Sequence, residues 1–231
     1  MELNTGYLLY GVSFTSENKA FFQEKEIEII NYKRATLYYK SQINSAQATD
    51  IQAQKEEGIA FFKILESLHT QQTLIPFRYK TVLLQKKQLT SFLKDRYDAI
   101  FRKLTEVEGY SEFSLKVLAQ TEETEGNMSA HSTGKEYMQH KFQAFKKNNY
   151  LHDKVKSVQA FLQDELNALS IEFKIEETKK HQLFYLNILI KNEIQSEYKK
   201  LLKQIEKKHP EFKYFSSGPW PIFTFGNFMD F

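Results

Sequence analysis

The stretch YSEFSLKVLA, Tyr110–Ala119, alternates apolar and polar side chains along its whole length. Its apolar positions share one face of an extended chain: Phe113, Leu115, Val117 and Ala119. The opposite face carries Glu112, Ser114 and Lys116. A period of two is typical of a β-strand with one buried and one exposed face. We therefore predict a strand here, in a sheet whose apolar side is covered by other elements.

Helices and further strands are predicted before this strand. Apolar residues recur at steps of three and four from Leu89 to Val107, which is the period of one helix face. A second helix is predicted from Asp50 to about His69, with its apolar face at Ile59, Phe62, Leu65 and Leu68. Apolar or alternating runs predict extended chain at 6–14, 26–42 and 73–84.

A polar stretch of small residues, Gln120–Glu136, follows the strand and predicts a linker. Beyond it, apolar steps predict a long helix from about Thr133 to Leu169, and Pro210 ends another helix that begins at Glu193. Strands are predicted at 170–176, 181–190 and 211–215. This irregular mixture favours the α+β class. We predict two domains of ferredoxin-like size, at 1–122 and 133–231, joined by a linker at 123–132.

The composition is that of an ordinary globular protein, with 231 residues, 41% of them hydrophobic and 26% charged. Lys and Arg number 32 against 29 Asp and Glu, and the net charge of +3 is too small to predict attraction to nucleic acid or anionic lipid. There is no cysteine, which excludes disulfides and thiolate chemistry. The sequence has no signal-peptide pattern and no apolar run of the roughly 18–20 residues that span a membrane. We expect a soluble, cytoplasmic protein.

Motifs of catalysis are missing from the sequence. The glycines are single, so neither a phosphate-binding loop nor a GxSxG motif occurs. The six histidines never have HxxxH or HExxH spacing, and we predict no metal site, no cofactor and no enzyme activity. The lysines of 199–208 leave open an RNA-binding ferredoxin-like module, because such sheets commonly bind RNA. Glutamates among these lysines explain them equally well as an ion-paired surface.

The C-terminal segment SSGPWPIFTFGNFMDF, Ser216–Phe231, is aromatic, whereas chain ends are usually polar. Two prolines flank Trp220 and fix the backbone around it. Two uses remain open, packing on the protein itself, favoured for Trp220 and Phe223, and contact with a partner protein, favoured for Phe228 and Phe231. The candidate partner-binding residues are Arg78, Trp220, Phe223, Phe225, Phe228 and Phe231.

Several segments resemble motifs of the gas vesicle GvpL/GvpF family, in the order in which the family has them. SGPWPIFTF, Ser217–Phe225, is similar to the TGPWPPYSF-like signature, and LIPFRYKTV, Leu74–Val82, resembles LPVRFGTVF. GYSEFSLKV resembles GxxEWxVKV, STGKEYM resembles SGRDYL, and the N-terminal YLLYGV also fits. The chain departs from the pattern at Tyr79, Lys80, Phe113 and Ile222, where the family has phenylalanine, glycine, tryptophan and proline.

The resemblance implies a fold and a function. The fold would be an N-terminal modified ferredoxin-like domain followed by a C-terminal α+β domain with a long helix and a small antiparallel sheet. The function would be gas vesicle assembly, as a minor shell component or a chaperone-like factor. Such a protein would bind the gas vesicle shell protein, which is small and hydrophobic, and other accessory proteins. It would have no catalytic activity and would be associated with gas vesicles in the cytoplasm.

Overall fold

The computed structural model describes residues 5–15, 26–43, 51–119, 134–169, 171–177 and 183–227. The chain forms two compact units, one of Met1–Glu112 with Pro219–Phe231 and one of Phe113–Gly218. The N-terminal unit therefore contains both ends of the chain. These bounds differ from the predicted domains, which assigned the last residues to the C-terminal half. The linker predicted at 123–132 lies outside the described residues.

A five-stranded sheet forms the centre of the N-terminal unit, with the order β2-β3-β1-β4 and with β5 also paired to β1. Its strands are β1 (Thr5–Phe14), β2 (Glu28–Tyr32), β3 (Ala35–Ile43), β4 (Ile75–Pro76) and β5 (Val82–Leu83). β1 pairs antiparallel with β3, β4 and β5, and β2 pairs antiparallel with β3. Pro76 lies in β4 at the end of this order, in agreement with the expectation that proline avoids a central strand.

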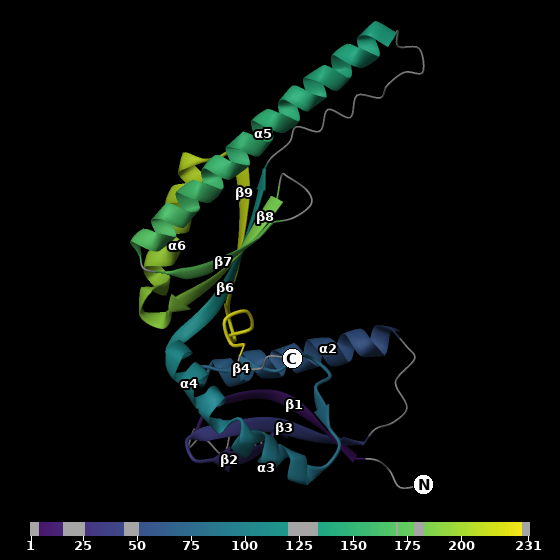
Figure 1. Ribbon diagram of the computed structural model, residues 1–231, viewed down its shortest axis with the longest axis vertical. Helices are drawn as coiled ribbons and strands as arrows, with labels where there is room; N and C mark the ends of the chain where they lie inside the picture. Colours follow the sequence, from purple (N-terminus) through teal and green to yellow (C-terminus); the bar gives the residue numbers. More distant parts are fainter. Residues whose placement is uncertain are drawn as a thin grey trace. The chain divides into compact units, whose positions relative to one another are not determined.

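Three helices cover this sheet, α2 (Ile51–His69) on one face and α3 (Lys86–Asp95) and α4 (Tyr97–Val107) on the other (Figure 1). The predicted face of α2 is partly wrong. The buried residues are Phe61, Leu65 and Leu68, whereas Ile59 and Phe62 are 46% and 49% exposed. The single helix predicted from Leu89 to Val107 is two helices, because Arg96 has φ −107° and ψ 8° and interrupts the helical backbone.

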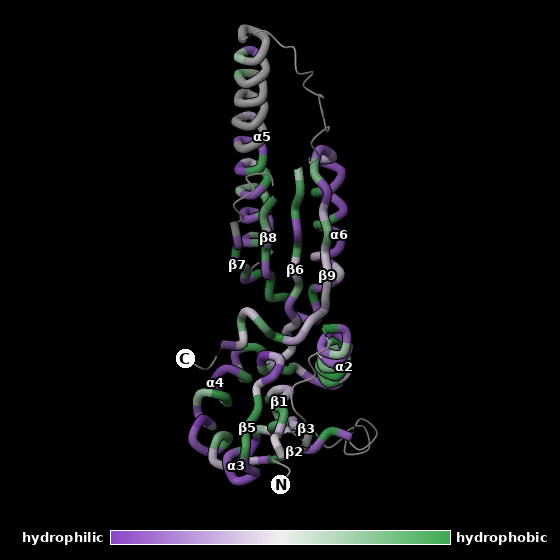
Figure 2. Tube along the Cα trace, turned by 90° about the vertical axis from the view of Figure 1, so that its right-hand side faces the viewer, coloured by the Kyte–Doolittle hydropathy of each residue, from purple (hydrophilic) through white to green (hydrophobic). Residues whose placement is uncertain are grey.

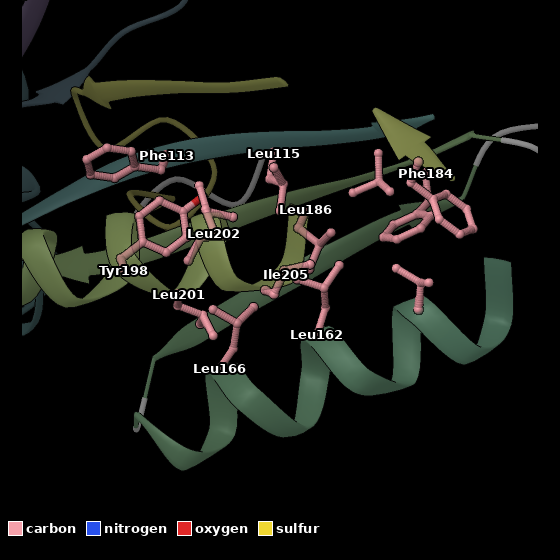
Figure 3. Close-up of a cluster of buried hydrophobic side chains, with 14 of the residues drawn as sticks. Phe113, Leu115, Leu162, Leu166, Phe184, Leu186, Tyr198, Leu201, Leu202 and Ile205 are labelled. Carbon is pink, nitrogen blue, oxygen red and sulfur yellow. The ribbon is translucent and has the colours of Figure 1, made fainter. Parts of the chain in front are cut away.

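A four-stranded sheet with the order β7-β8-β6-β9 forms the centre of the second unit. A few residues of two of its strands belong to the first unit. Its strands are β6 (Tyr110–Ala119), β7 (Glu172–Glu177), β8 (Leu183–Lys191) and β9 (Phe212–Trp220). The long helix α5 (Gly134–Ala168), the short 3-10 helix η1 (Asn192–Ile194) and α6 (Gln195–Lys208) complete it. Figure 3 shows the core in which α5 and α6 meet the sheet. The apolar face predicted for β6 is confirmed, since Phe113, Leu115, Val117 and Ala119 are all buried.

Helices and two antiparallel sheets together make this an α+β protein, which confirms the predicted class. The alternating strand β6 and the terminal strand β9 each contain a point at which the chain passes from one unit to the other. Among the described helices, none combines the length and the apolar character that crossing a membrane requires.

Candidate functional site

The segment 219–227, which begins with the last two residues of β9, packs within the N-terminal unit. Ile222 is completely buried and Phe225 is 6% exposed. The amide of Ile222 donates a hydrogen bond of 2.9 Å to the carbonyl of Leu74, the residue before β4. The C-terminal segment is therefore a structural part of the N-terminal unit, and its two most deeply buried side chains offer no surface to a partner.

Glu112 holds the same segment through its carboxylate. Its two oxygens accept hydrogen bonds from the amide of Thr224 at 2.7 Å and from the hydroxyl of Thr224 at 2.6 Å. A carboxylate is costly to bury unless it is hydrogen-bonded, and these two donors satisfy it. The sequence analysis placed Glu112 on the polar face of its strand. That face was expected to be exposed, but the residue is 6% exposed because the C-terminal segment covers it.

Two glycines permit the path of this segment. A Cβ atom at Gly226 would lie 2.3 Å from the carbonyl oxygen of Ile222 and 2.7 Å from Cγ2 of Ile75. These distances leave no room for any side chain. Gly218, which lies within β9, has φ 125°, a conformation that residues with a side chain rarely adopt.

Three segments that are far apart in the sequence thus meet at one place. We name this arrangement the tail clasp and define it by Leu74, Glu112, Ile222, Thr224 and Gly226. Its members come from LIPFRYKTV, from GYSEFSLKV and from SGPWPIFTFG. The segments that carry the family resemblance therefore build a structural contact, and their side chains make no cluster of chemically reactive groups.

A tight turn explains another part of the LIPFRYKTV segment. The carbonyl of Arg78 accepts hydrogen bonds from the amide of Thr81 at 3.1 Å and from its hydroxyl at 2.7 Å. Lys80, at the third position of the turn, has φ 67°. That conformation favours glycine, which is the residue in the family pattern at this position. The side chain of Arg78 is exposed, so its guanidinium lies on the surface while its carbonyl closes the turn.

An exposed aromatic patch lies beside the anchored segment. The rings of Phe62 on α2 and Phe223 have centroids 6.1 Å apart and are 49% and 42% exposed. Ile59, three residues before Phe62 on the same helix, is 46% exposed. We define the aromatic patch as Ile59, Phe62 and Phe223.

The other candidate partner-binding residues have different positions. Trp220 is half-buried and Phe225 is buried, and Phe228 and Phe231 lie outside the described residues. Phe62 was not among the predicted partner-binding residues because its ring was expected on the core face of the helix. The spacing of Phe61, Leu65 and Leu68, which is also helical, was the signal that could have shown which face is buried.

A half-buried histidine, His69, contacts the residue that precedes Glu112 of the clasp. Nε2 of His69 lies 3.0 Å from the hydroxyl of Ser111, the residue before Glu112. Burial lowers the pKa of His69 to about 4, so the ring is neutral at physiological pH. Its Nδ1 atom is buried without a hydrogen-bond partner in the described part of the chain. A single histidine in a sequence gives no signal that shows whether its ring is buried, so this contact could not be predicted.

The described residues contain no group of three or more acidic or histidine side chains placed to bind a metal ion. The arrangement around the clasp is instead one of apolar contacts, satisfied hydrogen bonds and exposed rings. Exposed apolar rings of this kind are common at the contact surfaces between proteins.

Comparison with known proteins agrees with this description. The family model of gas vesicle synthesis protein GvpL/GvpF matches residues 6–227. The crystal structure of the gas vesicle protein GvpF from Anabaena sp. PCC7120 is similar with a TM-score of 0.74 and 19% identity, covering 96% of each chain. That of GvpF from Microcystis aeruginosa has a TM-score of 0.70 and 15% identity, covering 96% of this chain and 99% of the other.

No curated protein matches the sequence. The two crystal structures show that the fold is shared. The family match includes every residue of the tail clasp. The chain therefore belongs to the GvpL/GvpF family of gas vesicle synthesis proteins.

Proposed function

We propose that this protein is an accessory factor of gas vesicle assembly, either a minor shell component or a chaperone-like protein. It binds the small hydrophobic shell protein and other accessory proteins of the gas vesicle. A shell subunit with an apolar face aggregates in water unless that face is covered until it polymerises. The observation that carries the proposal is the aromatic patch, in which two phenyl rings stay about half exposed although Ile222 and Phe225 of the same segment are buried.

The tail clasp makes this patch suitable for binding. Phe223 lies between Ile222 and Thr224, whose backbone amides are both hydrogen-bonded within the unit. Its ring is therefore presented on a backbone that is already ordered, and binding loses less conformational entropy. Covering the exposed half of each ring contributes roughly 1 kcal/mol, since complete burial of a phenylalanine contributes about 1.5–3 kcal/mol.

We also propose that the N-terminal unit is a modified ferredoxin-like domain. The antiparallel order β4-β1-β3-β2, with the β2–β3 hairpin and with α2 between β3 and β4, supports this. The second unit is then the α+β domain with a long helix, α5, and a small sheet.

The test is capture of the small shell protein by the full chain. Replacing both Phe62 and Phe223 by serine should reduce the captured amount at least about tenfold, because the two rings supply the exposed apolar area. The matched control is Ile51→Ser, which removes an 83% exposed side chain from the first residue of α2. Circular dichroism and thermal unfolding verify that all variants fold.

Undiminished capture by the folded double variant would contradict the role of the patch. A truncation that removes only residues 228–231 tests Phe228 and Phe231 separately. The truncation begins after Asn227 because Gly226 belongs to the tail clasp, and its loss would disturb the fold itself. If the truncated protein showed reduced capture and the double variant did not, the binding surface would be assigned to residues 228–231.

A further inference from the structure

The first part of α5 extends beyond the core of the second unit. Among the described side chains of this helix, the buried ones begin at Val155, although the helix starts at Gly134. About 20 residues, or roughly 30 Å at 1.5 Å per residue, thus precede the first buried one among the described side chains. Figure 1 shows this part of α5 running past the ends of the strands in its own unit, and in Figure 2 the lower part of α5 lies beside β7. A helix of that length is marginally stable alone in water.

Large apolar side chains are exposed along this part of α5. Met138, Phe142 and Tyr150 are 66%, 59% and 63% exposed. At about 100° per residue, these three positions fall within an arc of roughly 120°. They therefore form a stripe on one side of the helix, which is the pattern of a helix that packs against a partner.

The same part of the helix is strongly basic. Residues 134–154 hold five lysines and two acidic residues, a net charge of +3, which equals the net charge of the whole chain. The remainder of the chain is therefore neutral overall, so the positive charge is concentrated in this part of the sequence. The charged residues are Lys135, Lys141, Lys146, Lys147 and Lys154, with Glu136 and Asp153.

A cavity of about 310 Å³ lies at the inner end of the stripe. Tyr150, Asp153 and Lys154 line it from α5, and His209 and Glu211 line it from the turn after α6. Nζ of Lys154 lies 3.7 Å from Glu211 Oε1 and 5.5 Å from the centre of the Tyr150 ring. Nδ1 of His209 lies 3.8 Å from the same oxygen of Glu211. A cavity of this size can accept one or two side chains of a partner.

We propose that the first part of α5, with this cavity at its inner end, is a docking surface for an acidic, amphipathic helical segment of a partner protein. The apolar face of the segment covers Met138, Phe142 and Tyr150, and its acidic residues supply the charge opposite to that of this part of the chain. The proposal concerns the second unit and does not rest on the gas vesicle function or on the aromatic patch.

Charge decides between the possible occupants. A second copy of this chain would bring a second net charge of +3 to the same surface, and like charges at close range are unfavourable. A phosphate backbone has no apolar side chains with which to cover Met138, Phe142 and Tyr150 or to fill the cavity. An acidic amphipathic helix satisfies both conditions, because it supplies apolar side chains and a charge opposite to that of residues 134–154.

The experiment measures binding of two synthetic peptides to the full chain by fluorescence anisotropy at about 50 mM salt. Both are amphipathic helices of roughly three heptads with leucine at a and d, one with glutamate and the other with lysine at the remaining positions. The acidic peptide should bind at least about tenfold more tightly than the basic one. Raising the salt to about 300 mM should weaken its binding severalfold, because exposed charges are then screened.

Met138→Glu is the informative variant, since it places a negative charge in the stripe at a position that is 66% exposed and leaves the core intact. It should weaken binding of the acidic peptide about tenfold or more. Ile51→Glu, at an exposed position of α2 in the other unit, is the matched control and should bind as the unchanged chain does. The Phe62 and Phe223 double serine variant should also bind unchanged, which separates this surface from the aromatic patch.

Equal affinity for both peptides, no detectable binding of the acidic one, or full binding by Met138→Glu would overturn the proposal. So would tighter binding of phosphatidylserine-containing vesicles or of single-stranded RNA than of the acidic peptide. Self-association of the chain in sedimentation that Met138→Glu abolishes would assign the surface to a second copy instead.

Discussion

The C-terminal segment, residues 219–227, and the first part of α5, residues 134–153, are both rich in apolar side chains but use them in opposite ways. The sequence of the C-terminal segment predicts an exposed aromatic chain end, yet Ile222 and Phe225 are buried in the N-terminal unit. The sequence of the first part of α5 predicts an ordinary helix, yet Met138, Phe142 and Tyr150 are exposed. Burial follows from the contacts that fix the backbone. The C-terminal segment has a buried carboxylate and a close-packed glycine, whereas the described side chains of residues 134–153 include none that is buried.

The largest expected effect comes from truncating one apolar side chain in each region. Ile222→Ala should lower the free energy of unfolding of the N-terminal unit by about 3 kcal/mol, because it leaves a cavity in a fully buried site. Met138→Ala should change the free energy of unfolding by less than about 0.5 kcal/mol. Trp220, the only tryptophan of the chain, lies in the N-terminal unit, and its fluorescence during chemical denaturation reports the unfolding of that unit. Circular dichroism of the same samples follows the unfolding of the second unit, which contains Met138 and the helices α5 and α6.

Two outcomes would contradict the expected difference in stability between Ile222→Ala and Met138→Ala. Equal small effects would mean that the C-terminal segment is not needed for folding, and the tail clasp would be a loose contact. A large effect of Met138→Ala would mean that the first part of α5 is already covered in the free protein. Circular dichroism of the same samples detects any loss of helix in α5.

Acid should loosen the N-terminal unit through His69. Its folded pKa of about 4 lies below the unfolded value of about 6.5, so below pH 6.5 the unfolded state takes up the proton more readily. The stabilisation by the neutral ring is complete above pH 6.5 and is lost as the pH falls through 4. At pH 4.5 the loss should be about 2–3 kcal/mol. Ser111, which His69 contacts, precedes Glu112, so the tail clasp should loosen as well.

The control for this pH effect is His69→Gln, which cannot titrate. Chemical denaturation of both proteins at pH 7 and 4.5 separates His69 from all other titrating groups, because those are shared. Wild type should lose more stability than the variant on acidification. Equal losses would show that His69 is solvated, in contrast to its burial beside Ser111.

Removing the carboxylate of the clasp should have a slightly smaller effect. Glu112→Ala removes the carboxylate that accepts hydrogen bonds from the amide and the hydroxyl of Thr224, and we expect a loss of about 2 kcal/mol in the N-terminal unit. Glu176→Ala is the matched control, since that exposed glutamate accepts one hydrogen bond of 2.9 Å from Asn187 in the second unit. It should change stability by less than about 0.5 kcal/mol. A similar loss in both variants would remove Glu112 as the residue that fixes the C-terminal segment.

Much of the architecture could be predicted from the sequence, because it depends on local periodicity. The alternation of Phe113 to Ala119 and the steps from Val155 to Leu166 are confirmed as buried faces. The break at Arg96 was missed because apolar steps continue across it from Leu93 to Tyr97. On α2, two helical patterns overlap, and periodicity alone did not decide whether Phe61 or Phe62 faces the sheet.

The candidate site could be predicted only in part, because it depends on contacts between distant segments. The motifs around Leu74, Glu112 and Thr224 are each visible in the sequence, but nothing local shows that they meet. The buried state of Glu112 requires a covering segment that lies 112 positions away in the sequence. Phe225 was predicted to bind a partner because the sequence does not show where an aromatic ring near the chain end packs. The structure shows that this ring is buried.

The smallest effect should come from a substitution in the turn that precedes β5. This substitution should raise the stability of the N-terminal unit, which contains the tail clasp. Lys80 has φ 67°, which strains a residue that carries a side chain, so Lys80→Gly should stabilise the N-terminal unit by up to about 1 kcal/mol. Lys63→Gly, at an exposed position in the middle of α2, should instead destabilise the N-terminal unit by about 1 kcal/mol. Denaturation followed by Trp220 fluorescence measures both. A loss of stability on Lys80→Gly would mean that the entropy of the unfolded chain outweighs the relieved strain, and that the turn from Arg78 to Thr81 is held by its two hydrogen bonds alone.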